Sequence, residues 1–448
     1  MVRWKYWARL LFLVALASIA MFVAFVLWRF SLDRLVGGEI AAIHEQSYPV
    51  SLAELNRWYP RVPPGENGAF VLGKAFANQS ARSHSSAPVC DDPVVRSPAD
   101  ELPTDADRRV VEDYLDERSD ALALLHEASE ISRSRFPIDL GTLSIMPYPH
   151  LGKLIHSAHL LEVEAANHTD HADWESAAVS VQSLFALSHS LVREPLVRSY
   201  LARLECQRIA IDSLQDLLSR TGLTDAHLDT LGAVLERADD QRGLARAFIG
   251  QRCIGIRGFD MMDDTLNLAR APVGRSHSFS QRLLVGLDLL FSSPGYVYDL
   301  CGFLQWDELH YLRVMDSYIQ TAQTTFPERI DEAQELRRSL EHESGLHAFS
   351  RGWLHGMNGP RIILKDAAMT AQLRAARIAV AVERFRLARG QLPRTLADLD
   401  PFGLRALPAD PFNGRPLRYK RLPNGYAVSS VGENSADQTD DITFVVER

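Results

Sequence analysis

The chain has 448 residues, which at roughly 100–200 residues per domain leaves room for two or three domains. Apolar residues make up 46% and charged residues 23%, which excludes a disordered or collagen-like chain. With 48 basic and 57 acidic residues the formal net charge is −9, which argues against a nucleic-acid-binding protein that works through a broad basic surface. The composition thus excludes several classes of protein without selecting a function.

The N-terminal region carries the clearest signal. Leu10 to Trp28 is a run of 19 residues without a charge. At 1.5 Å per residue a helix of this length extends about 28 Å, enough to cross the hydrocarbon core of a bilayer. We therefore predict a tail over residues 1–9 and a transmembrane helix over residues 10–28.

The charges that flank the run predict its orientation. Three basic residues precede it with no acid among them, whereas the two basic residues that follow are diluted by two acids. The positive-inside rule then places the N-terminus in the cytoplasm and residues 29–448 on the other side of the membrane. The flanking residues are Arg3, Lys5 and Arg9 on one side and Arg29, Asp33, Arg34 and Glu39 on the other.

A cleaved signal peptide is the alternative interpretation of this region. Ser18-Ile19-Ala20 is a weak cleavage site, and cleavage there would leave the apolar segment Met21 to Trp28 as a new terminus. The apolar region of a secretory signal has about 7–15 residues, which is shorter than this run. The pattern favours an uncleaved anchor.

The four cysteines would lie in an oxidising compartment if the bulk of the chain is external. Cys90, Cys206, Cys253 and Cys301 form no CxxC pair and permit three pairings. The last three lie within apolar helical patterns, where a cysteine is usually a small buried apolar residue. Disulfide pairing therefore stays open.

Residues 29–358 read as a linker region followed by a helical domain. Residues 29–104 combine a juxtamembrane helix over Ser31 to Gln46, a capping box of Ser51 and Glu54, and a helix over Ala69 to Asn78, before a loop over 79–104 rich in Ser, Pro and Asp. Residues 105–358 show apolar residues at helical spacing with caps and short connections, which predicts antiparallel helices.

Residues 359–448 form a distinct C-terminal segment. Ile362 to Arg389 predicts one amphipathic helix whose charged residues, Glu383 among them, point outward. Beyond it, Asn424-Gly425 separates two short alternating segments, which is a strong hairpin signal. The fold class we predict is mainly α: a transmembrane helix, a large helical domain and a small α+β cap of one helix with an antiparallel sheet.

Residues 369–448, about 80 of the 448, resemble the C-terminal half of the type II secretion major pseudopilin. The matching blocks are AVAVERFRLARGQLP at 379–393, PADPFNG at 408–414, YAVSSVG at 426–432 and DDI at 440–442. The remainder resembles uncharacterised bacterial membrane-anchored helical proteins with such a tail, through PPGEN at 63–67, REPLVR at 193–198 and Leu201. The resemblance implies a bacterial inner-membrane protein with its bulk in the periplasm, and supplies no activity.

Two departures from the pseudopilin pattern bear on function. A prepilin has a leader that ends in Gly, then Phe-Thr-Leu-Ile-Glu, whereas Arg9-Leu10-Leu11-Phe12 has neither the Gly nor the Glu. More than 300 residues also separate the anchor from the pilin-like helix, so the continuous spine of a pilus subunit is missing. We therefore expect a chain that does not polymerise.

The resemblance also implies a calcium site, because the pseudopilin binds calcium in the loop before its last strand. The matching loop here holds Asp437, Asp440 and Asp441, together with Glu433 and Asn434. Calcium takes six to eight oxygen ligands, which carboxylates and turn carbonyls can supply. The spacing is not that of an EF-hand, and a solvated acidic loop is the alternative.

Three histidine patterns are weaker candidates. His168 to Asp173 has zinc-ligand residue types, but Asp173 is also placed to cap a helix that begins at Trp174. Glu341 to His347 spaces its histidines one residue too far apart for HExxH. His150, His156 and His159 lie near one helix start, with no carboxylate spaced to orient His156 or His159.

We assign no catalytic or cofactor-binding residue from the sequence, since no nucleophile elbow, Walker loop or dinucleotide motif occurs in it. The leading hypothesis is a non-catalytic, single-pass envelope interaction or assembly protein, with other envelope proteins as partners and no nucleic acid. The alternative is an envelope hydrolase whose site lies in the helical domain and uses His150, His156 or His159.

Overall fold

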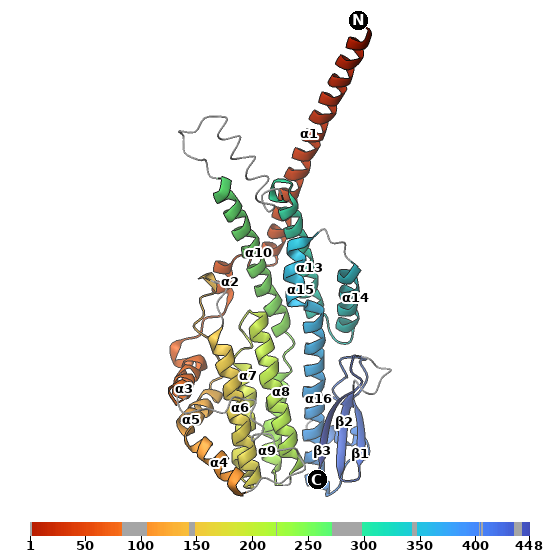
Figure 1. Cartoon of the computed structure of the whole chain (residues 1–448). Coiled ribbons are helices and arrows are strands. Elements are labelled where there is room, and N and C mark those ends of the chain that lie inside the picture. Colours follow the sequence, from red (N-terminus) through yellow and green to blue (C-terminus); the bar gives the residue numbers. More distant parts are fainter. Residues whose placement is uncertain are drawn as a thin grey trace. The chain divides into compact units, whose positions relative to one another are not determined.

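The computed structural model shows a mainly helical chain with one apolar N-terminal helix and a three-stranded antiparallel sheet near its C-terminus (Figure 1). This confirms the predicted fold class at that level of detail. The chain divides into two compact units: unit 1 comprises residues 1–55, 252–317 and 342–358, and unit 2 the rest. The structure describes residues 2–82, 105–142, 148–220, 222–270, 298–342, 347–402, 404, 406–433 and 441–448.

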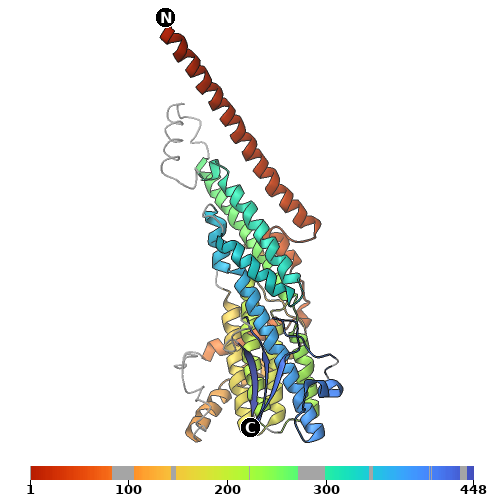
Figure 2. The same cartoon turned by 90° about the vertical axis from the view of Figure 1, so that its right-hand side faces the viewer.

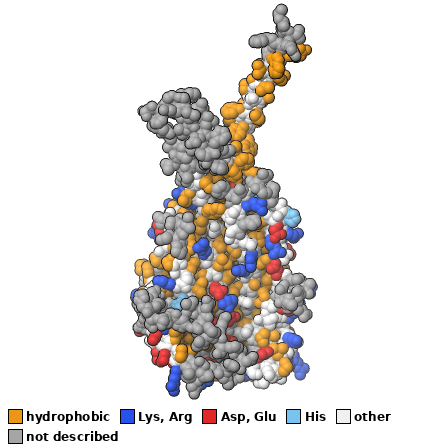
Figure 3. Space-filling view, viewed as in Figure 1, with side chains coloured by type: hydrophobic (Ala, Val, Ile, Leu, Met, Phe, Trp, Pro, Cys, Tyr) orange, Lys and Arg blue, Asp and Glu red, His pale blue; other side chains and the backbone are white. Residues whose placement is uncertain are grey.

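Unit 1 begins with helix α1 (Val2–Glu45), a single continuous helix where the sequence suggested an anchor and a separate juxtamembrane helix. No proline interrupts it, and Gly37 and Gly38 alone do not break it. Large apolar side chains between Leu10 and Trp28 are exposed, and Figure 3 shows them along α1. Within the described residues, α1 is the one helix long and apolar enough to span a membrane.

Burial in unit 1 starts directly after this run. Leu32 is 4% exposed, and Ile43 packs with Val50, Ile256 and Leu312 in one apolar cluster. The thiol of Cys253 donates to the Pro49 carbonyl at 3.1 Å and holds the turn after α1. The other helices of unit 1 are the start of α2 (Leu52–Trp58), most of α10 (Gly243–Arg270), most of α13 (Phe303–Gln323) and α15 (Ala348–Met357).

Unit 2 is built on a layer of packed helices. Helices α6, α7 and α8 pack on one another, α3 and α5 cover one side, and α9 packs on α7 and α16. Their bounds are α3 (Gly68–Arg82), α4 (Asp105–Asp116), α5 (Ser119–Ser129), α6 (Pro149–Asp170), α7 (Trp174–His189), α8 (Val197–Ser219), α9 (Asp225–Ala238), α14 (Glu328–His342) and α16 (Gly359–Arg389), with short 3-10 turns at Pro64–Glu66, Leu140–Thr142 and Leu396–Phe402.

Helix α16 is the centre of unit 2. Nineteen of its residues are buried, because α8 and α9 pack on it and strands β2 and β3 also pack on it. The strands β1 (Arg418–Leu422), β2 (Gly425–Ser430) and β3 (Ile442–Glu447) pair in sequence order, with Leu422 opposite Gly425 at the predicted hairpin. Figure 2 shows the sheet running beside α16.

One expectation about α16 is wrong. Glu383 does not point outward; it is 3% exposed and its carboxylate accepts from Arg386 at 2.8 Å and from Arg448 at 2.5 Å. The end of the chain, just after β3, lies against this part of α16 and donates to it. The helical periodicity alone could not show that a sheet covers the charged side of the helix.

A buried aspartate organises the turn before the sheet. Asp410 is 2% exposed, and its carboxylate accepts from the amides of Phe412 and Val431 and from the hydroxyl of Ser430, each at 2.9 Å. The Gly414 amide donates to the Asp410 carbonyl at 2.8 Å. The PADPFNG block therefore forms a tight turn that is fastened to the end of β2.

Candidate functional site

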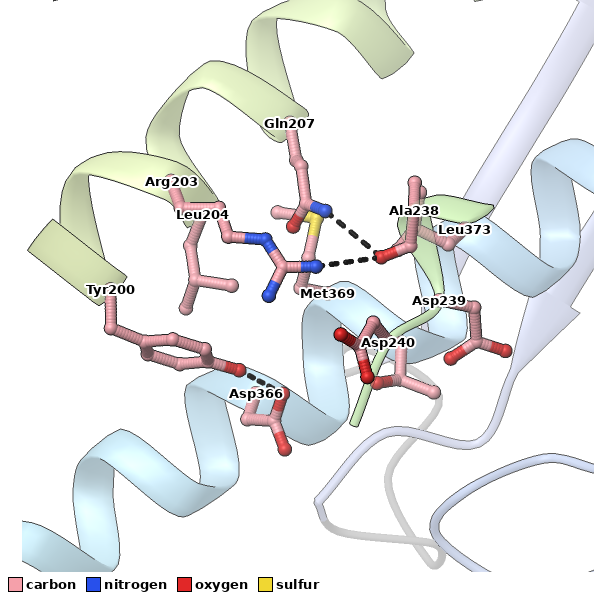
Figure 4. Close-up of a pocket in the computed structure, with 11 residues that line it drawn as sticks. Tyr200, Arg203, Leu204, Gln207, Ala238, Asp239, Asp240, Asp366, Met369 and Leu373 are labelled. Atoms are coloured by element: carbon pink, nitrogen blue, oxygen red, sulfur yellow. Dashed lines mark hydrogen bonds between the residues drawn. The ribbon is translucent and has the colours of Figure 1, made fainter. Parts of the chain in front are cut away.

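A small polar pocket lies in unit 2 between α8, the end of α9 and α16 (Figure 4). Its volume is about 10 Å³, which is room for about one water molecule. Polar side chains reach it from three elements and lie close together, although they are far apart in the sequence. They are Tyr200, Arg203 and Gln207 of α8, Asp239 and Asp240 after α9, and Asp366 and Thr370 of α16.

Two of these side chains cap the C-terminus of α9. Arg203 Nη2 and Gln207 Nε2 each donate to the Ala238 carbonyl at 3.1 Å, one of the terminal carbonyls that a helix leaves without an internal partner. Arg203 Nε and Asp239 Oδ1 are buried without a hydrogen-bond partner within the described residues. A single water in the pocket is the ligand that this space and these groups suit.

The lower part of the pocket is a charged cluster around Asp366. Asp366 is 4% exposed, and its carboxylate accepts from the Tyr200 hydroxyl at 2.5 Å and pairs with Arg329 at 2.8 Å. Burial raises the pKa of Asp366, and Arg329 and the Tyr200 hydrogen bond oppose that shift. Burial and the charge of Asp366 raise the pKa of Tyr200. The cluster joins α8, α14 and α16.

A chain of serine, imidazole and carboxylate lies elsewhere in unit 2. His126 Nδ1 lies 2.9 Å from Ser183 Oγ, and His126 Nε2 lies 2.9 Å from Glu164 Oε2, which also accepts from Ser180 at 2.8 Å. These are the residue types of a nucleophile, a base and an acid. Ser183 is only 2% exposed and stands inside α7, where the helix occupies the backbone amides that an oxyanion would need.

His150 belongs to a second such chain. Its Nε2 lies 3.0 Å from Glu194 Oε1, which accepts from Ser199 at 2.5 Å, while Glu194 Oε2 is buried without a hydrogen-bond partner among the described residues. The His150 ring stacks on Phe136 with centroids 4.7 Å apart. Glu194 thus fixes the start of α8 to the start of α6.

The structure brings together the PPGEN stretch at 63–67 and the REPLVR stretch at 193–198. In PPGEN, Asn67 exchanges hydrogen bonds with the backbone of Arg135 at 2.8 and 2.9 Å. The next residue, Phe136, stacks on His150, the partner of Glu194 in REPLVR. Close packing adds to this: a Cβ on Gly250 would lie 1.7 Å from the carbonyl of Pro195.

The other predicted histidines do not converge on one site. Burial, with Arg118 and His159 nearby, lowers the pKa of His156. His159 Nδ1 lies 2.8 Å from Glu162 Oε2, so the expectation that no carboxylate is spaced to orient it is wrong. Asp173 caps α7 by accepting from the Ser176 amide at 3.2 Å, as the helix-connection interpretation predicts.

Of the acidic loop, Asp437 and Asp440 lie outside the described residues, and calcium binding there stays a prediction. Asp441 pairs with Arg418 at 3.3 Å, and Glu433 pairs with Arg337 at 3.2 Å. In the described part of the chain, no group of three or more His, Cys, Asp or Glu side chains is arranged to hold a metal ion. Cys206, Cys253 and Cys301 are free thiols, and Cys90 lies outside the described residues.

Unit 1 holds a polar network that the sequence did not reveal. The buried carboxylate of Asp307 accepts from Tyr298 and from Ser350, each at 2.7 Å, and lies 3.3 Å from His347 Nδ1. The ring of His347 stacks on that of His310 at 4.0 Å. His347 therefore faces His310. Residues 343–346, in the middle of the HExxH-like stretch, lie outside the described part of the chain.

Helical periodicity assigns several of these polar residues to helices, but it does not show which of them form a polar cluster. Asp366 and Arg203 lie within helical stretches, and only a charge at a position of apolar spacing marks them in the sequence.

Comparison with family models, with curated proteins and with solved structures finds no match to this chain.

Proposed function

We propose that the chain is a membrane-anchored, non-catalytic interaction or assembly protein of a bacterial envelope, with its N-terminus in the cytoplasm and its bulk in the periplasm. The observation that carries the proposal is the uncovered apolar run of α1, none of whose most apolar 18-residue window is buried. A helix of this kind gains stability in a bilayer, because about 20 apolar residues match the hydrocarbon thickness.

The polar pocket between α8, α9 and α16 is not itself a substrate site. Its volume of about 10 Å³ leaves no room for a substrate, whereas ligand pockets span roughly 300–1,000 Å³. Most of its polar groups bond to neighbouring helices, as Tyr200 does to Asp366 and Arg203 to Ala238. These groups stabilise the packing of unit 2, which suits a rigid platform.

We assign partner binding to the outer face of the C-terminal sheet. Tyr426 and Val428 of β2 are buried toward α16, whereas Ala427 on the opposite face is partly exposed and pairs with the exposed Lys420. The resemblance to the type II secretion pseudopilin supports another envelope protein, from a secretion or pilus system, as the partner.

The test is crosslinking and copurification of the tagged full-length chain from its native membrane. Deleting the tail would remove α16 from the core of unit 2, so a surface substitution is the cleaner variant. We expect secretion or pilus components to be enriched with the unmodified chain and lost with Lys420→Glu. The matched control is Lys153→Glu, an exposed lysine on α6. If Lys420→Glu captures secretion or pilus components as well as the unmodified chain does, the assignment of partner binding to the outer face of the sheet is contradicted.

A hydrolase is the second candidate, and the chain of Ser183, His126 and Glu164 is the observation that favours it. The burial of Ser183 opposes it. A fluorophosphonate probe distinguishes the two functions: labelling of the native chain that Ser183→Ala abolishes would establish a nucleophilic serine. We expect no labelling, because the hydroxyl is enclosed within α7.

A further inference from the structure

Exposed apolar side chains beyond the anchor are concentrated in unit 1. Five large ones occur in the described part of unit 1 after Trp28, and four occur in the much longer described part of unit 2. Scattered exposed apolar residues are normal, whereas a contiguous exposed apolar patch marks an interaction surface. The two sets are Phe30, Leu35, Met261, Leu300 and Trp353 in unit 1, and Phe70, Val110, Val179 and Leu387 in unit 2.

Gly302 and Phe303 of unit 1 contact α1 at the point where its apolar run ends. The ring of Trp28, the last residue of that run, contacts the ring of Phe303 with centroids 6.1 Å apart. A Cβ on Gly302 would lie 3.0 Å from Arg29 and 3.3 Å from Trp28. If residues 10–28 fill a hydrocarbon core of about 30 Å, Phe303 lies at its edge.

The residues around Phe303 include aromatic types that are common at a membrane interface. The Phe303 ring lies 5.4 Å from Tyr298 and 6.0 Å from Trp306, and Leu300 between them is 43% exposed. Tyr and Trp are enriched where hydrocarbon meets water, because their rings combine an apolar body with a polar group.

We propose that the segment Tyr298–Trp306 binds the lipid surface of the membrane that α1 spans, with Leu300 inserted among the lipids. This rests on the proposed anchor, since α1 sets the depth of the segment. Lipid is the occupant because the segment continues the lipid-facing surface of α1 through the contact of Trp28 with Phe303. Unit 1 would then rest on the bilayer by a second, interfacial contact.

The test places an environment-sensitive fluorophore at position 300 of the full chain in vesicles of phosphatidylethanolamine and phosphatidylglycerol. Leu300→Cys is compared with Leu387→Cys, because Leu387 of unit 2 is 42% exposed and matches Leu300 in residue type and exposure. Cys90 and Cys301 are replaced by Ala in both variants. Cys206 and Cys253 can remain, since both are fully buried and burial raises the pKa of Cys253 to about 12, which keeps the thiol protonated.

Lipids that carry a nitroxide near the headgroup should quench the fluorophore at position 300 several-fold more than at position 387, with blue-shifted emission at position 300. Equal weak quenching at both positions would overturn the inference. A blue shift at position 300 without lipid quenching would also overturn it, because protein rather than lipid would then cover Leu300. Alkaline extraction of the unlabelled chain tests the anchor separately. If the chain stays in the vesicles while the fluorophore at position 300 is unquenched, the proposed anchor stands and only the proposed lipid contact of Tyr298–Trp306 is contradicted.

Discussion

The hydroxyl of Tyr200 lies 2.5 Å from the carboxylate of Asp366, and these residues are 166 positions apart in the chain. The other oxygen of that carboxylate accepts from Arg329 at 2.8 Å. All three side chains are buried. A buried charge is tolerated when it is paired and hydrogen-bonded, so the Tyr200 hydroxyl contributes to the packing of α8 on α16.

We predict that Tyr200→Phe lowers the free energy of unfolding of unit 2 by about 1–3 kcal/mol, because it removes a donor from a buried carboxylate. Chemical denaturation of the full chain in detergent measures this. The control is Tyr148→Phe, whose hydroxyl makes no hydrogen bond to another described residue of the chain, with an expected change of about 0.5 kcal/mol or less. Equal effects of the two substitutions would show that the Tyr200 bond contributes nothing specific.

Asp410→Ala should destabilise the C-terminal turn. Three donors, the amides of Phe412 and Val431 and the Ser430 hydroxyl, would lose their acceptor, which we expect to cost about 2–4 kcal/mol. Thermal unfolding followed by circular dichroism measures the loss. Asp400→Ala, at an exposed aspartate in the same segment, is the control, and a melting temperature as high for Asp410→Ala as for Asp400→Ala would refute the prediction.

Unit 1 should lose stability as the pH rises from about 4.5 to about 7. Burial, reinforced by Asp260, Asp263 and Asp33, raises the pKa of Glu308 from 4.5 to about 7. A carboxyl group whose pKa is higher in the folded state stabilises the fold below its unfolded pKa, and that stability is lost as the pH rises through the folded value. The loss is on the order of 2–3 kcal/mol.

Glu308→Gln tests this dependence, because the amide is neutral at every pH. We expect the variant to melt at nearly the same temperature at pH 5 and pH 8, while the unmodified chain melts lower at pH 8. A pH dependence that the substitution leaves unchanged would assign the effect to other groups.

If the acidic loop binds calcium, chelation should lower the melting temperature of the full chain in detergent by several degrees, and Asp440→Ala should abolish the difference. The physical reason is that an ion bound only by the folded state stabilises it by mass action. Asp116→Ala, at an exposed aspartate of α4, should retain the response. An identical melting temperature of the unmodified chain with and without chelator would contradict calcium binding by the loop.

The predicted sidedness has its own test. A phosphatase that folds only outside the cytoplasm, fused after residue 448, should be active in cells. The reason is the basic excess before Leu10, which favours retention of the N-terminus in the cytoplasm. An inactive fusion together with an active cytoplasmic reporter at the same position would reverse the orientation.

Local signals in the sequence predicted local structure well. Asp173 caps α7, as its place before Trp174 predicts. Asn424-Gly425 marks the hairpin of β1 and β2. Each of these depends on residues a few positions apart, whose backbone geometry is set by their own side chains.

The polar clusters could not be predicted in the same way. Glu383 was expected on an outward face. Helical spacing cannot show that the end of the chain after β3 lies against it, so this expectation was wrong. His150 was recognised as a candidate, but its partner Glu194 is 44 residues away. No pattern along the chain links such pairs, because their contact is set by how helices pack.

The sequence by itself determined the apolar run of α1, the helical character of the bulk and the small C-terminal sheet, since hydrophobic period and turn chemistry act over short distances. Only the tertiary structure decided which charges are buried together, as with Tyr200, Arg329 and Asp366. It also decided that Phe303 meets Trp28 where α1 ends its apolar run. Burial of a charge is stable only when distant segments supply its partners, so that information lies in the packing of the chain rather than in its local order.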